Sequence, residues 1–343
     1  MSGVQEKRPD RETILAMARA FQGPCVLGAA AELDVFSAMG NDRLECDEVA
    51  ARLRSDRRAT RVLLDALVAL GLLDKQEDRY AVPVELQPVL SEGTPHSVLP
   101  MIRHNMTCLR RWSQLAWVTK AGIPGPQQAS IRGFEADRAA FVAGMHVVSG
   151  PIADDLVARL GPPEFQHLLD VGGASGTWTL AFLRAVPGAR ATIFDLPHAI
   201  DQARQRFSLL GSAHRVAFAA GDFYCDELPA GADFAWVSAI IHQHGRQDNR
   251  ALFAKMFRAL EPGGQIGIRD VVMEPCRTRP VLGALFAVNM LTATERGGTF
   301  TLAEITEDLE AAGFREVELR VRSDDMSSVV TARKPDARSL GDR

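Results

Sequence analysis

Several features that define a class of protein are scarce in this chain of 343 residues. Its five cysteines are scattered and form no CxxC pair, so neither a disulfide framework nor a common zinc spacing is indicated. The formal net charge of −4 gives no overall basic field for nucleic acid or anionic lipid. No continuous apolar run approaches bilayer length, and the polar N-terminus lacks the apolar core of a signal peptide. These absences predict a soluble, cytoplasmic protein without a metal, membrane or nucleic-acid partner.

The chain does contain enough apolar sequence for a sizeable core. Hydrophobic residues make up 46% and charged residues 24%, over a length that suits two domains. Up to about residue 81 the pattern predicts helices, then a helix, a turn, a second helix and a short strand pair, an order that resembles a winged helix. Residues 95–160 are predicted to be mainly helical.

From residue 164 onward, predicted strands and helices alternate. Such alternation implies an α/β fold, with a mostly parallel sheet that is covered on both faces. The end of the chain differs, because REVELRVRS and SSVVTARKP are two strands joined by a short turn. They predict an antiparallel hairpin at one edge of the sheet.

The stretch DVGGASG, at 170–176, lies between an apolar strand and the helix TWTLAFLRA. A strand, a tight glycine turn and a helix can hold a nucleotide-like ligand at the helix N-terminus. The dinucleotide pattern G-x-G-x-x-G fails at Ala174 and Thr177. The spacing acid-x-G-x-G-x-G, which suits S-adenosylmethionine, fits with Ala174 in place of the middle glycine. A tight turn without a ligand is the alternative.

Acidic residues follow the next two predicted strands. Asp195 ends the second strand, where a carboxylate can accept hydrogen bonds from ribose hydroxyls. Asp222 and Phe223 follow the third strand, where an acceptor and an aromatic ring suit adenine. Carboxylates at three strand ends and a closing hairpin favour a methyltransferase over a dehydrogenase.

The ordered motifs FVAGMHVVSG, LLDVGGASG, IFDLP, GDFY, SAIIHQHGRQDN, LEPGGQIGIRD and ALFAVNMLTATERGG run through the chain. From about Ile14 to about Ala332, it resembles the dimeric S-adenosylmethionine-dependent small-molecule O-methyltransferases, which include plant phenylpropanoid enzymes and bacterial antibiotic-tailoring enzymes. The resemblance implies a Rossmann-like class I methyltransferase domain with a seven-stranded sheet, preceded by a winged-helix-like dimerisation domain. It predicts a dimerisation domain at 1–95, a helical linker and acceptor-pocket segment at 96–160 and a catalytic domain at 161–343.

The resemblance also implies roles for individual residues, and S-adenosylhomocysteine as the cofactor product. His242 matches the catalytic base, and Asn289 and Met290 match positions that line the acceptor pocket. Together with the residues that the loop itself indicates, the expected cofactor-binding set is Met145, Ser149, Asp170, Gly172, Gly173, Asp195, Leu196, Asp222, Phe223 and Ser238.

Departures from the family pattern surround His242. Gln243 replaces the acid that usually follows the base, and GGTFT lacks the glutamate of a second flanking acid. Asp270 matches the first flanking acid, and it either orients His242 or is an ordinary strand-end acid. His244 forms an HxH pair with His242, but no third metal ligand is nearby, which favours a pocket-wall or hydrogen-bonding role.

The predicted chemistry is an in-line transfer of a methyl group to a small acceptor. Alignment contributes most of the rate, and a base such as His242 activates a hydroxyl. Further acceptor contacts are expected from His104, Trp112, Phe141, His146 and His244, which suggests a flat, largely apolar acceptor. The incomplete acid set leaves open methylation at carbon or nitrogen, or a member that binds cofactor without transferring methyl.

A DNA-binding regulator is a further alternative. The segment RLRSDRRATR, at 52–61, places several arginines around the start of a possible recognition helix. The chain is acidic overall, and the strongly apolar segment that follows suits buried packing. A solvated helix face is therefore favoured over a phosphate-binding patch.

Overall fold

The computed structural model describes residues 8–161, 164–211 and 213–336, which divide into two compact units. The first unit comprises the described residues up to Leu109, together with Gln128–Val147. The second comprises Arg110–Gln127 and the described residues from Val148 onward. The segment 96–160 thus contributes to both units, and its expected role in an acceptor pocket stays a prediction.

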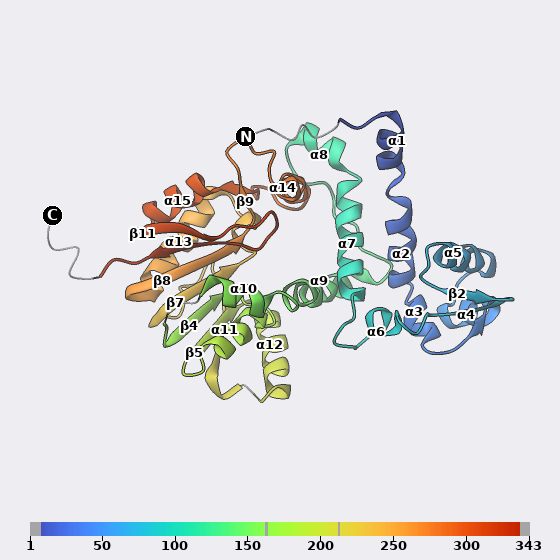
Figure 1. Cartoon of the computed structure of the whole chain (residues 1–343), viewed down its shortest axis with the longest axis horizontal. Coiled ribbons are helices and arrows are strands. Elements are labelled where there is room, and N and C mark those ends of the chain that lie inside the picture. The colour runs from blue at the N-terminus through green and yellow to red at the C-terminus, as the bar shows by residue number, and fades with distance from the viewer. Residues whose placement is uncertain (1–7, 162–163, 212, 337–343) are drawn as a thin grey trace. The chain divides into compact units, whose positions relative to one another are not determined.

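The first unit is mainly helical and carries a small antiparallel sheet of order β1-β3-β2 (Figure 1). Helix α4, a turn, helix α5 and the β2–β3 hairpin follow in the winged-helix order that the sequence predicts. Helices α7 and α9 end just past the boundary of this unit. The elements are α1 (Arg11–Arg19), α2 (Gln22–Glu32), α3 (Val35–Met39), β1 (Leu44–Glu45), α4 (Cys46–Leu53), α5 (Arg57–Ala69), β2 (Asp74–Gln76), β3 (Arg79–Ala81), α6 (Gln87–Leu90), α7 (Leu99–Trp112) and α9 (Gly133–Ser149).

Local signals in the sequence fix the two helices of this winged-helix region. A capping box of Glu45 and Glu48 begins α4. The Asp56 carboxylate accepts a hydrogen bond of 2.8 Å from the backbone N–H of Ala59 and begins α5. The buried stripe of α5 includes Leu64 and packs into the core of the unit.

Three arginines of this region, Arg52, Arg57 and Arg61, pair with carboxylates of the same unit. Arg52 lies 3.1 Å from Asp42, and Arg61 lies 3.5 Å from Asp78. The paired charges agree with a solvated helix face, as the sequence analysis favours.

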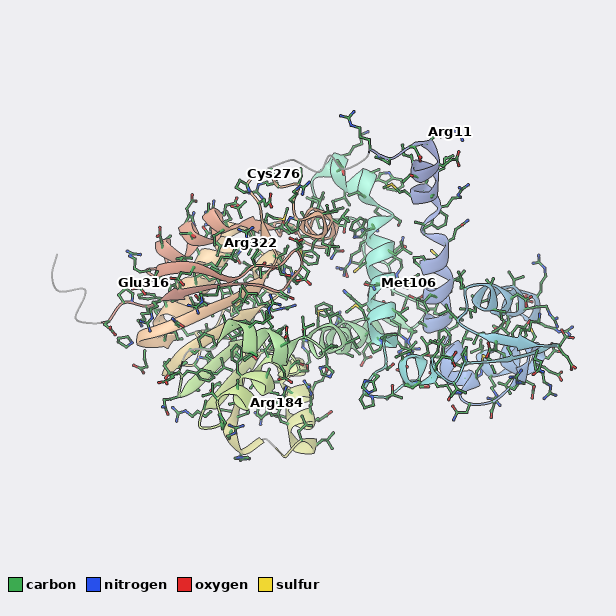
Figure 2. All side chains as sticks on the ribbon, viewed as in Figure 1. Arg11, Met106, Arg184, Cys276, Glu316 and Arg322 are labelled. Carbon is green, nitrogen blue, oxygen red and sulfur yellow. The ribbon has the colours of Figure 1, made fainter. Side chains whose placement is uncertain are left out.

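Helices α1 and α2 form an apolar segment. By length and mean hydropathy, Arg11–Glu32 is apolar enough to cross a membrane. Its apolar residues do not form a continuous run, because Arg19 and Gln22 lie among them. Within the unit, α2 lies close to α7, since a Cβ on Gly28 would be 1.9 Å from Sδ of Met106, labelled in Figure 2.

The second unit is built on a seven-stranded sheet of order β11-β12-β8-β7-β4-β5-β6. Adjacent strands from β8 to β6 are parallel, whereas β12 is antiparallel to both β8 and β11. The hairpin that the C-terminal sequence predicts is therefore present, with β12 inserted beside β8. The strands are β4 (His167–Val171), β5 (Arg190–Asp195), β6 (Val216–Ala220), β7 (Ala232–Ser238), β8 (Leu260–Asp270), β11 (Arg315–Val321) and β12 (Ser328–Arg333).

Helices cover both faces of this sheet. Figure 1 shows α10, α11 and α12 on one face and α13 and α15 on the other. Helix α14 packs against α8 and against the short strand β9, which pairs in parallel with β10. The bounds are α8 (Leu115–Ala121), α10 (Ala153–Leu160), α11 (Thr177–Ala185), α12 (Pro197–Leu209), η1 (Ala213–Arg215), η2 (Ile241–Gln243), α13 (Arg246–Ala259), β9 (Val272–Met273), α14 (Val281–Ala293), β10 (Phe300–Thr301) and α15 (Leu302–Ala311).

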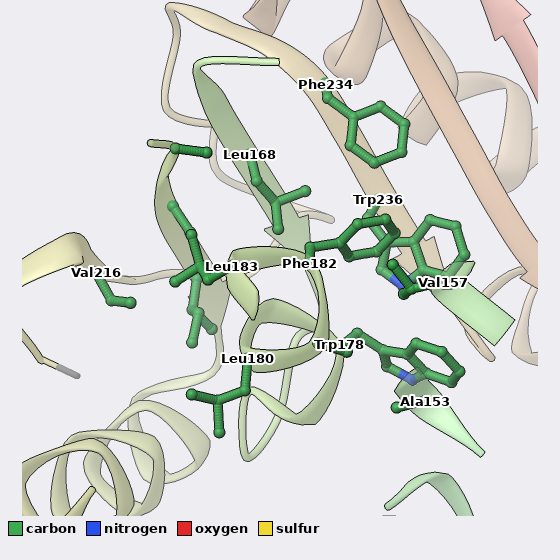
Figure 3. Close-up of a cluster of buried hydrophobic side chains, with 14 of the residues drawn as sticks. Ala153, Val157, Leu168, Trp178, Leu180, Phe182, Leu183, Val216, Phe234 and Trp236 are labelled. Carbon is green, nitrogen blue, oxygen red and sulfur yellow. The ribbon is translucent and has the colours of Figure 1, made fainter. Parts of the chain in front are cut away.

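The face under α10 and α11 carries an aromatic cluster, drawn in Figure 3. Phe182 of α11 packs edge-on against Trp236 of β7, with ring centroids 4.9 Å apart, and against Phe234 at 5.3 Å. Trp178 lies 5.6 Å from Trp236. Because side chains alternate along a strand, this cluster fixes which residues of β4, β7 and β8 point to the α11 face.

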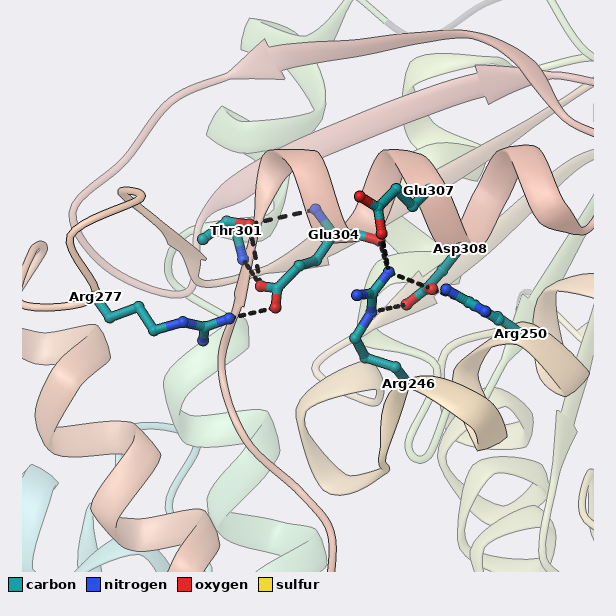
Figure 4. A network of polar contacts seen from close by, with 7 residues as sticks. All are labelled: Arg246, Arg250, Arg277, Thr301, Glu304, Glu307 and Asp308. Atoms are coloured by element: carbon teal, nitrogen blue, oxygen red, sulfur yellow. Dashed lines mark hydrogen bonds and ion pairs between the residues drawn. The ribbon is translucent and has the colours of Figure 1, made fainter.

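On the opposite face, a charged network joins α13 to α15 (Figure 4). The buried carboxylate of Asp308 accepts hydrogen bonds from Arg246, at 3.0 and 2.8 Å, and from Arg250. Arg246 also pairs with the exposed Glu307 at 2.7 Å. The network anchors α13, the helix that follows His242.

Candidate active site

The glycine loop joins β4 to α11 at the carboxyl edge of the sheet. Gly172 has a φ of +69°, and a Cβ there would lie 2.6 Å from Cδ1 of Ile240. Gly176 has a φ of +71°, and its Cβ would lie 2.4 Å from the Phe207 ring. Both positions therefore require glycine. Gly176 is the N-cap of α11 and brings the start of that helix to the edge where a ligand of this fold binds.

Arg206 of α12 supports this loop, a role that the sequence analysis missed. Its Nη1 donates to the backbone oxygen of Ser175 at 2.8 Å and to Oγ1 of Thr177 at 2.9 Å. Burial lowers the pKa of this guanidinium. An arginine 29 residues beyond Thr177 gives no sequence signal, because only the fold brings α12 to the loop.

Asp170 lies under the loop and is 1% exposed. Oγ1 of Thr179 donates to its Oδ2 at 2.5 Å, while Oδ1 is buried and has no hydrogen-bond partner among the described residues. Burial, with a smaller contribution from the nearby Asp195, raises the pKa of Asp170 to about 7, although the hydrogen bond from Thr179 lowers it. An orphaned carboxylate oxygen beneath a glycine loop suits a polar ligand that completes its hydrogen bonding.

Asp195 ends β5 and faces the loop. Its Oδ2 accepts the backbone N–H of Ala174, and its Oδ1 accepts that of Leu196, both at 2.7 Å. Burial raises the pKa of this carboxyl, and the two hydrogen bonds lower it. The side chain is thus held in one orientation, and each oxygen keeps a second lone pair for a hydroxyl donor.

The turn after β6 brings Asp222 and Phe223 to the same edge, both partly exposed. The next residue, Tyr224, hydrogen-bonds through its hydroxyl to Nδ1 of His244, and Phe223 contacts the His244 ring edge-on at 5.5 Å. Nε2 of His244 is buried without a partner in the described part of the chain, and burial lowers the pKa of its imidazole. The sequence analysis did not single out Tyr224, although it quoted GDFY.

His242 lies in η2, just beyond β7, and is 6% exposed. Its Nδ1 is 2.9 Å from both carboxylate oxygens of Asp270, the buried last residue of β8. The backbone N–H of Val271 also donates to Asp270, at 2.8 Å. Because a carboxylate only accepts, Nδ1 carries the proton and Nε2 presents its lone pair. The structure brings together the two residues for which the sequence predicted catalytic roles.

The wall beside His242 is apolar. Phe286 of α14 meets the His242 ring edge-on, with centroids 4.7 Å apart and an interplanar angle of 88°. One helical turn further along α14, Asn289 accepts a hydrogen bond of 2.9 Å from Nε1 of Trp112. The sequence analysis proposed Trp112 and Asn289 separately, and the structure pairs them. Met290, the residue after Asn289, is buried.

The remaining predicted residues divide between the units. Ser149 and Ser238 belong to the second unit, with the loop and His242. Four others, described within the first unit, are His104, Phe141, Met145 and His146. In that unit the rings of His104 and Phe141 lie 5.0 Å apart.

Among the described residues, no group of three or more histidine, cysteine, aspartate or glutamate side chains is arranged to hold a metal ion. His242 and His244 do not form such a group, because Nδ1 of each is engaged by a neighbouring side chain.

Comparison with known proteins identifies the chain. The O-methyltransferase domain family matches residues 109–315, and the O-methyltransferase dimerisation domain family matches residues 15–84. The tetracenomycin polyketide synthesis 8-O-methyl transferase TcmO of Streptomyces glaucescens is 34% identical over 310 residues, covering 89% of this chain and 91% of its own. The N,N-dimethyltransferase OxyT of Streptomyces rimosus is 28% identical, covering 88% and 90%.

A solved structure agrees with these relatives. Human N-acetylserotonin methyltransferase in complex with S-adenosylmethionine matches with a TM-score of 0.78 and 26% identity, covering 97% of this chain and 100% of that one. The chain belongs to the O-methyltransferase family. It has the class I methyltransferase fold with an N-terminal dimerisation domain, and it is an S-adenosylmethionine-dependent methyltransferase. The glycine loop and the orphaned Oδ1 of Asp170 fit this cofactor.

Proposed function

We propose that this enzyme transfers the methyl group to a hydroxyl of a small, flat, aromatic or polyketide-like acceptor, with His242 as general base. The observation that carries the proposal is the buried His242–Asp270 pair, whose Nδ1–carboxylate contact leaves Nε2 as the acceptor of a proton. The apolar helix α14 beside it supports a flat acceptor. The similarity to an 8-O-methyl transferase of polyketide synthesis supports the acceptor class.

The chemistry divides between the cofactor and the chain. S-adenosylmethionine supplies a methyl group that its sulfonium has already activated. Nε2 of His242 takes the proton of the acceptor hydroxyl as the oxygen forms its bond to the methyl carbon and the carbon–sulfur bond breaks. Asp270 holds the imidazole by its Nδ1–H and stabilises the imidazolium that forms. Phe286 and the burial of both residues exclude water from the proton transfer.

We also infer where the cofactor binds. Gly172, Gly173 and the start of α11 would face its amino-acid end, and Asp195 with Leu196 would bind the ribose. Asp222 and Phe223 would bind the adenine. The remaining members of the set in the second unit are Ser149, Asp170 and Ser238, and the role of Met145 stays a prediction from the resemblance. The glycine conformations and the fixed carboxylate of Asp195 support this assignment.

For the acceptor, the paired Trp112 and Asn289 support a pocket wall in the second unit. The proposed pocket wall of this unit also includes His244 and Met290, and the acceptor roles of His104, Phe141 and His146 stay predictions. We further propose a cytoplasmic homodimer that assembles through the N-terminal domain. Support comes from the exposed apolar side chains Ile14, Met17 and Phe21 on or beside α1.

Methylation of nitrogen is the second candidate. In the family pattern a second acid flanks the base, but here GGTFT lacks it, and Glu304 is engaged by Thr301 and Arg277. A single acid on His242 would suffice for an amine, which needs less help from a base than a phenol does. The similarity to an N,N-dimethyltransferase supports this alternative.

The test uses S-adenosylmethionine labelled at the methyl group, with aromatic hydroxyl and amine acceptors and S-adenosylhomocysteine formation as the second readout. We expect label on oxygen, and a loss of about 10²–10⁴-fold in turnover for His242→Ala with unchanged S-adenosylhomocysteine affinity. Asp270→Asn is expected to lose less, since it removes the charge that stabilises the imidazolium but leaves the base itself in place. His96→Ala, at an exposed histidine, is the matched control. Unchanged turnover in His242→Ala refutes the base, and label on nitrogen selects the alternative.

A further inference from the structure

Arg269 of β8 is a buried cation for which the proposed reaction has no use. Its side chain points to the α11 face of the sheet and is 3% exposed. The guanidinium lies over the Trp178 ring, 4.8 Å from the centroid, and Nη1 donates to Oγ of Ser238 at 3.1 Å. Nε is buried and has no hydrogen-bond partner in the described ranges.

The charge of this guanidinium is not matched by the protein. In the described part of the chain, no carboxylate forms an ion pair with Arg269. The charges of Asp270 and Asp325 raise the pKa of Arg269 only by electrostatic interaction at a distance. Burial lowers the pKa of Arg269 to about 10, so the group is still a cation at neutral pH. A buried charge without a paired anion costs stability, and the contact with Trp178 offsets only part of that cost.

Strand register places Arg269 beside the glycine loop. Asp170 of β4 pairs with Trp236 of β7, and Ser238 pairs with Arg269. Gly172 is two residues beyond Asp170, and Ser238 is two residues beyond Trp236, so the same register places Gly172 beside Ser238. Gly172, Ser238 and Arg269 therefore form one row at the carboxyl edge of three adjacent strands. Side chains in one row share a face.

The helix above this row is α11. Figure 3 shows Trp178, in its first turn, beside Trp236 on that face. The guanidinium therefore lies between the end of β7 and the helix that the glycine loop begins.

We propose that Arg269, with Ser238, binds the α-carboxylate of the amino-acid end of S-adenosylmethionine. This inference rests on the proposed function and deepens it, because Ser238 alone brings a neutral hydroxyl to a negatively charged group. A guanidinium aligned by an aromatic ring and a hydroxyl matches a carboxylate through parallel N–H donors. An acceptor carboxylate is the other source of the same chemistry. The row with Gly172 favours the cofactor, because Asp270 and His242 lie off the opposite face.

Calorimetry with two ligands tests the assignment. S-adenosylhomocysteine carries the carboxylate, whereas decarboxylated S-adenosylhomocysteine keeps the ammonium and lacks it. Wild type is expected to prefer the first ligand. Arg269→Met should weaken S-adenosylhomocysteine binding at least tenfold, about 1.4 kcal/mol, and leave the decarboxylated ligand within about twofold. Arg269→Lys, which keeps the charge, should retain part of the preference. The control is Arg204→Met, at an exposed arginine over the Phe218 ring.

Thermal melting of the ligand-free variants separates binding from folding. Arg269→Met should melt at or above the wild-type temperature, because it removes an unmatched buried charge. If Arg269→Met binds both ligands equally more weakly than wild type, or melts at a clearly lower temperature, the proposal is overturned in favour of a structural role. Unchanged affinity of Arg269→Met for S-adenosylhomocysteine also overturns the proposal. If in addition the KM of this variant rises only for acceptors that carry a carboxylate, Arg269 binds the acceptor and not the cofactor.

The failure of this inference is distinct from that of the proposed function. If His242→Ala loses turnover while Arg269→Met keeps its preference for S-adenosylhomocysteine, only the role of Arg269 is refuted. If wild type binds neither ligand, both are refuted, since the glycine loop then holds no such cofactor.

Discussion

The carboxyl group of Asp170 should make the stability of the ligand-free protein fall as the pH rises. Its pKa is about 7 in the folded chain because of burial, against an ordinary value of 3.8. Between these two values the unfolded chain has released the proton and the folded chain still holds it, so ionisation favours unfolding. The difference between the two pKa values corresponds to about 4 kcal/mol in the free energy of unfolding. About 3 kcal/mol of this is lost between pH 5 and pH 8.

Asp170→Asn removes this ionisation and keeps an oxygen that Thr179 can donate to. The assay is urea unfolding at pH 5 and pH 8, followed by tryptophan fluorescence. All four tryptophans belong to the second unit, so the signal reports on the unit that holds Asp170. Between pH 5 and pH 8, the free energy of unfolding of wild type should fall by about 3 kcal/mol more than that of Asp170→Asn. This corresponds to a shift of about 1–3 M in the urea midpoint. Asp201→Asn, at an exposed carboxylate of α12, should retain the wild-type pH dependence. Parallel pH profiles for wild type and Asp170→Asn would refute the reasoning.

Two further substitutions test the support of the site. Gly176→Ala should cost about 2–4 kcal/mol in the free energy of unfolding, from its positive φ and a contact that overpacks the rings behind the loop. Gly122 has a similar positive φ, but a Cβ there would meet no neighbouring atom, so Gly122→Ala should cost only about 1–2 kcal/mol. Equal losses for the two variants in denaturant titrations would contradict the packing argument. Asp308→Ala should cost about 2–3 kcal/mol because it removes the buried carboxylate that accepts hydrogen bonds from both Arg246 and Arg250 of α13. The exposed partner Glu307→Ala should cost less than about 1 kcal/mol, and the reverse order would show that the network is not centred on Asp308.

Sequence patterns were sufficient for the parts of the fold that depend on neighbours in the chain. The strand, glycine loop and helix at 167–185 follow from apolar residues and from glycine positions that the backbone conformation requires. The Asp56 cap and the C-terminal hairpin likewise follow from local residue types. Placing His242 and Asp270 at one sheet edge needed only the rule that parallel strands end together.

Contacts between distant elements could not be obtained in this way. Arg206 reaches the glycine loop from α12, and Tyr224 reaches His244 from the turn after β6, because the order of strands in the sheet brings those segments together. The hydrogen bond between Trp112 and Asn289 joins residues 177 positions apart. In each case the residue type alone does not indicate which distant residue the side chain will contact.

Arg269 illustrates why register carries information that spacing does not. In the sequence it is one polar residue in IGIRD, directly followed by an aspartate of opposite charge. Alternation along β8 sends the two side chains to opposite faces, so Asp270 holds His242 while Arg269 faces Trp178. Across the same face, Asp170 also has a buried oxygen without a partner. A chain that selection had tuned for stability alone would pair or remove such groups, because each destabilises the free protein. Their persistence at the edge where the cofactor of this family binds is best explained by a ligand of mixed charge that satisfies them.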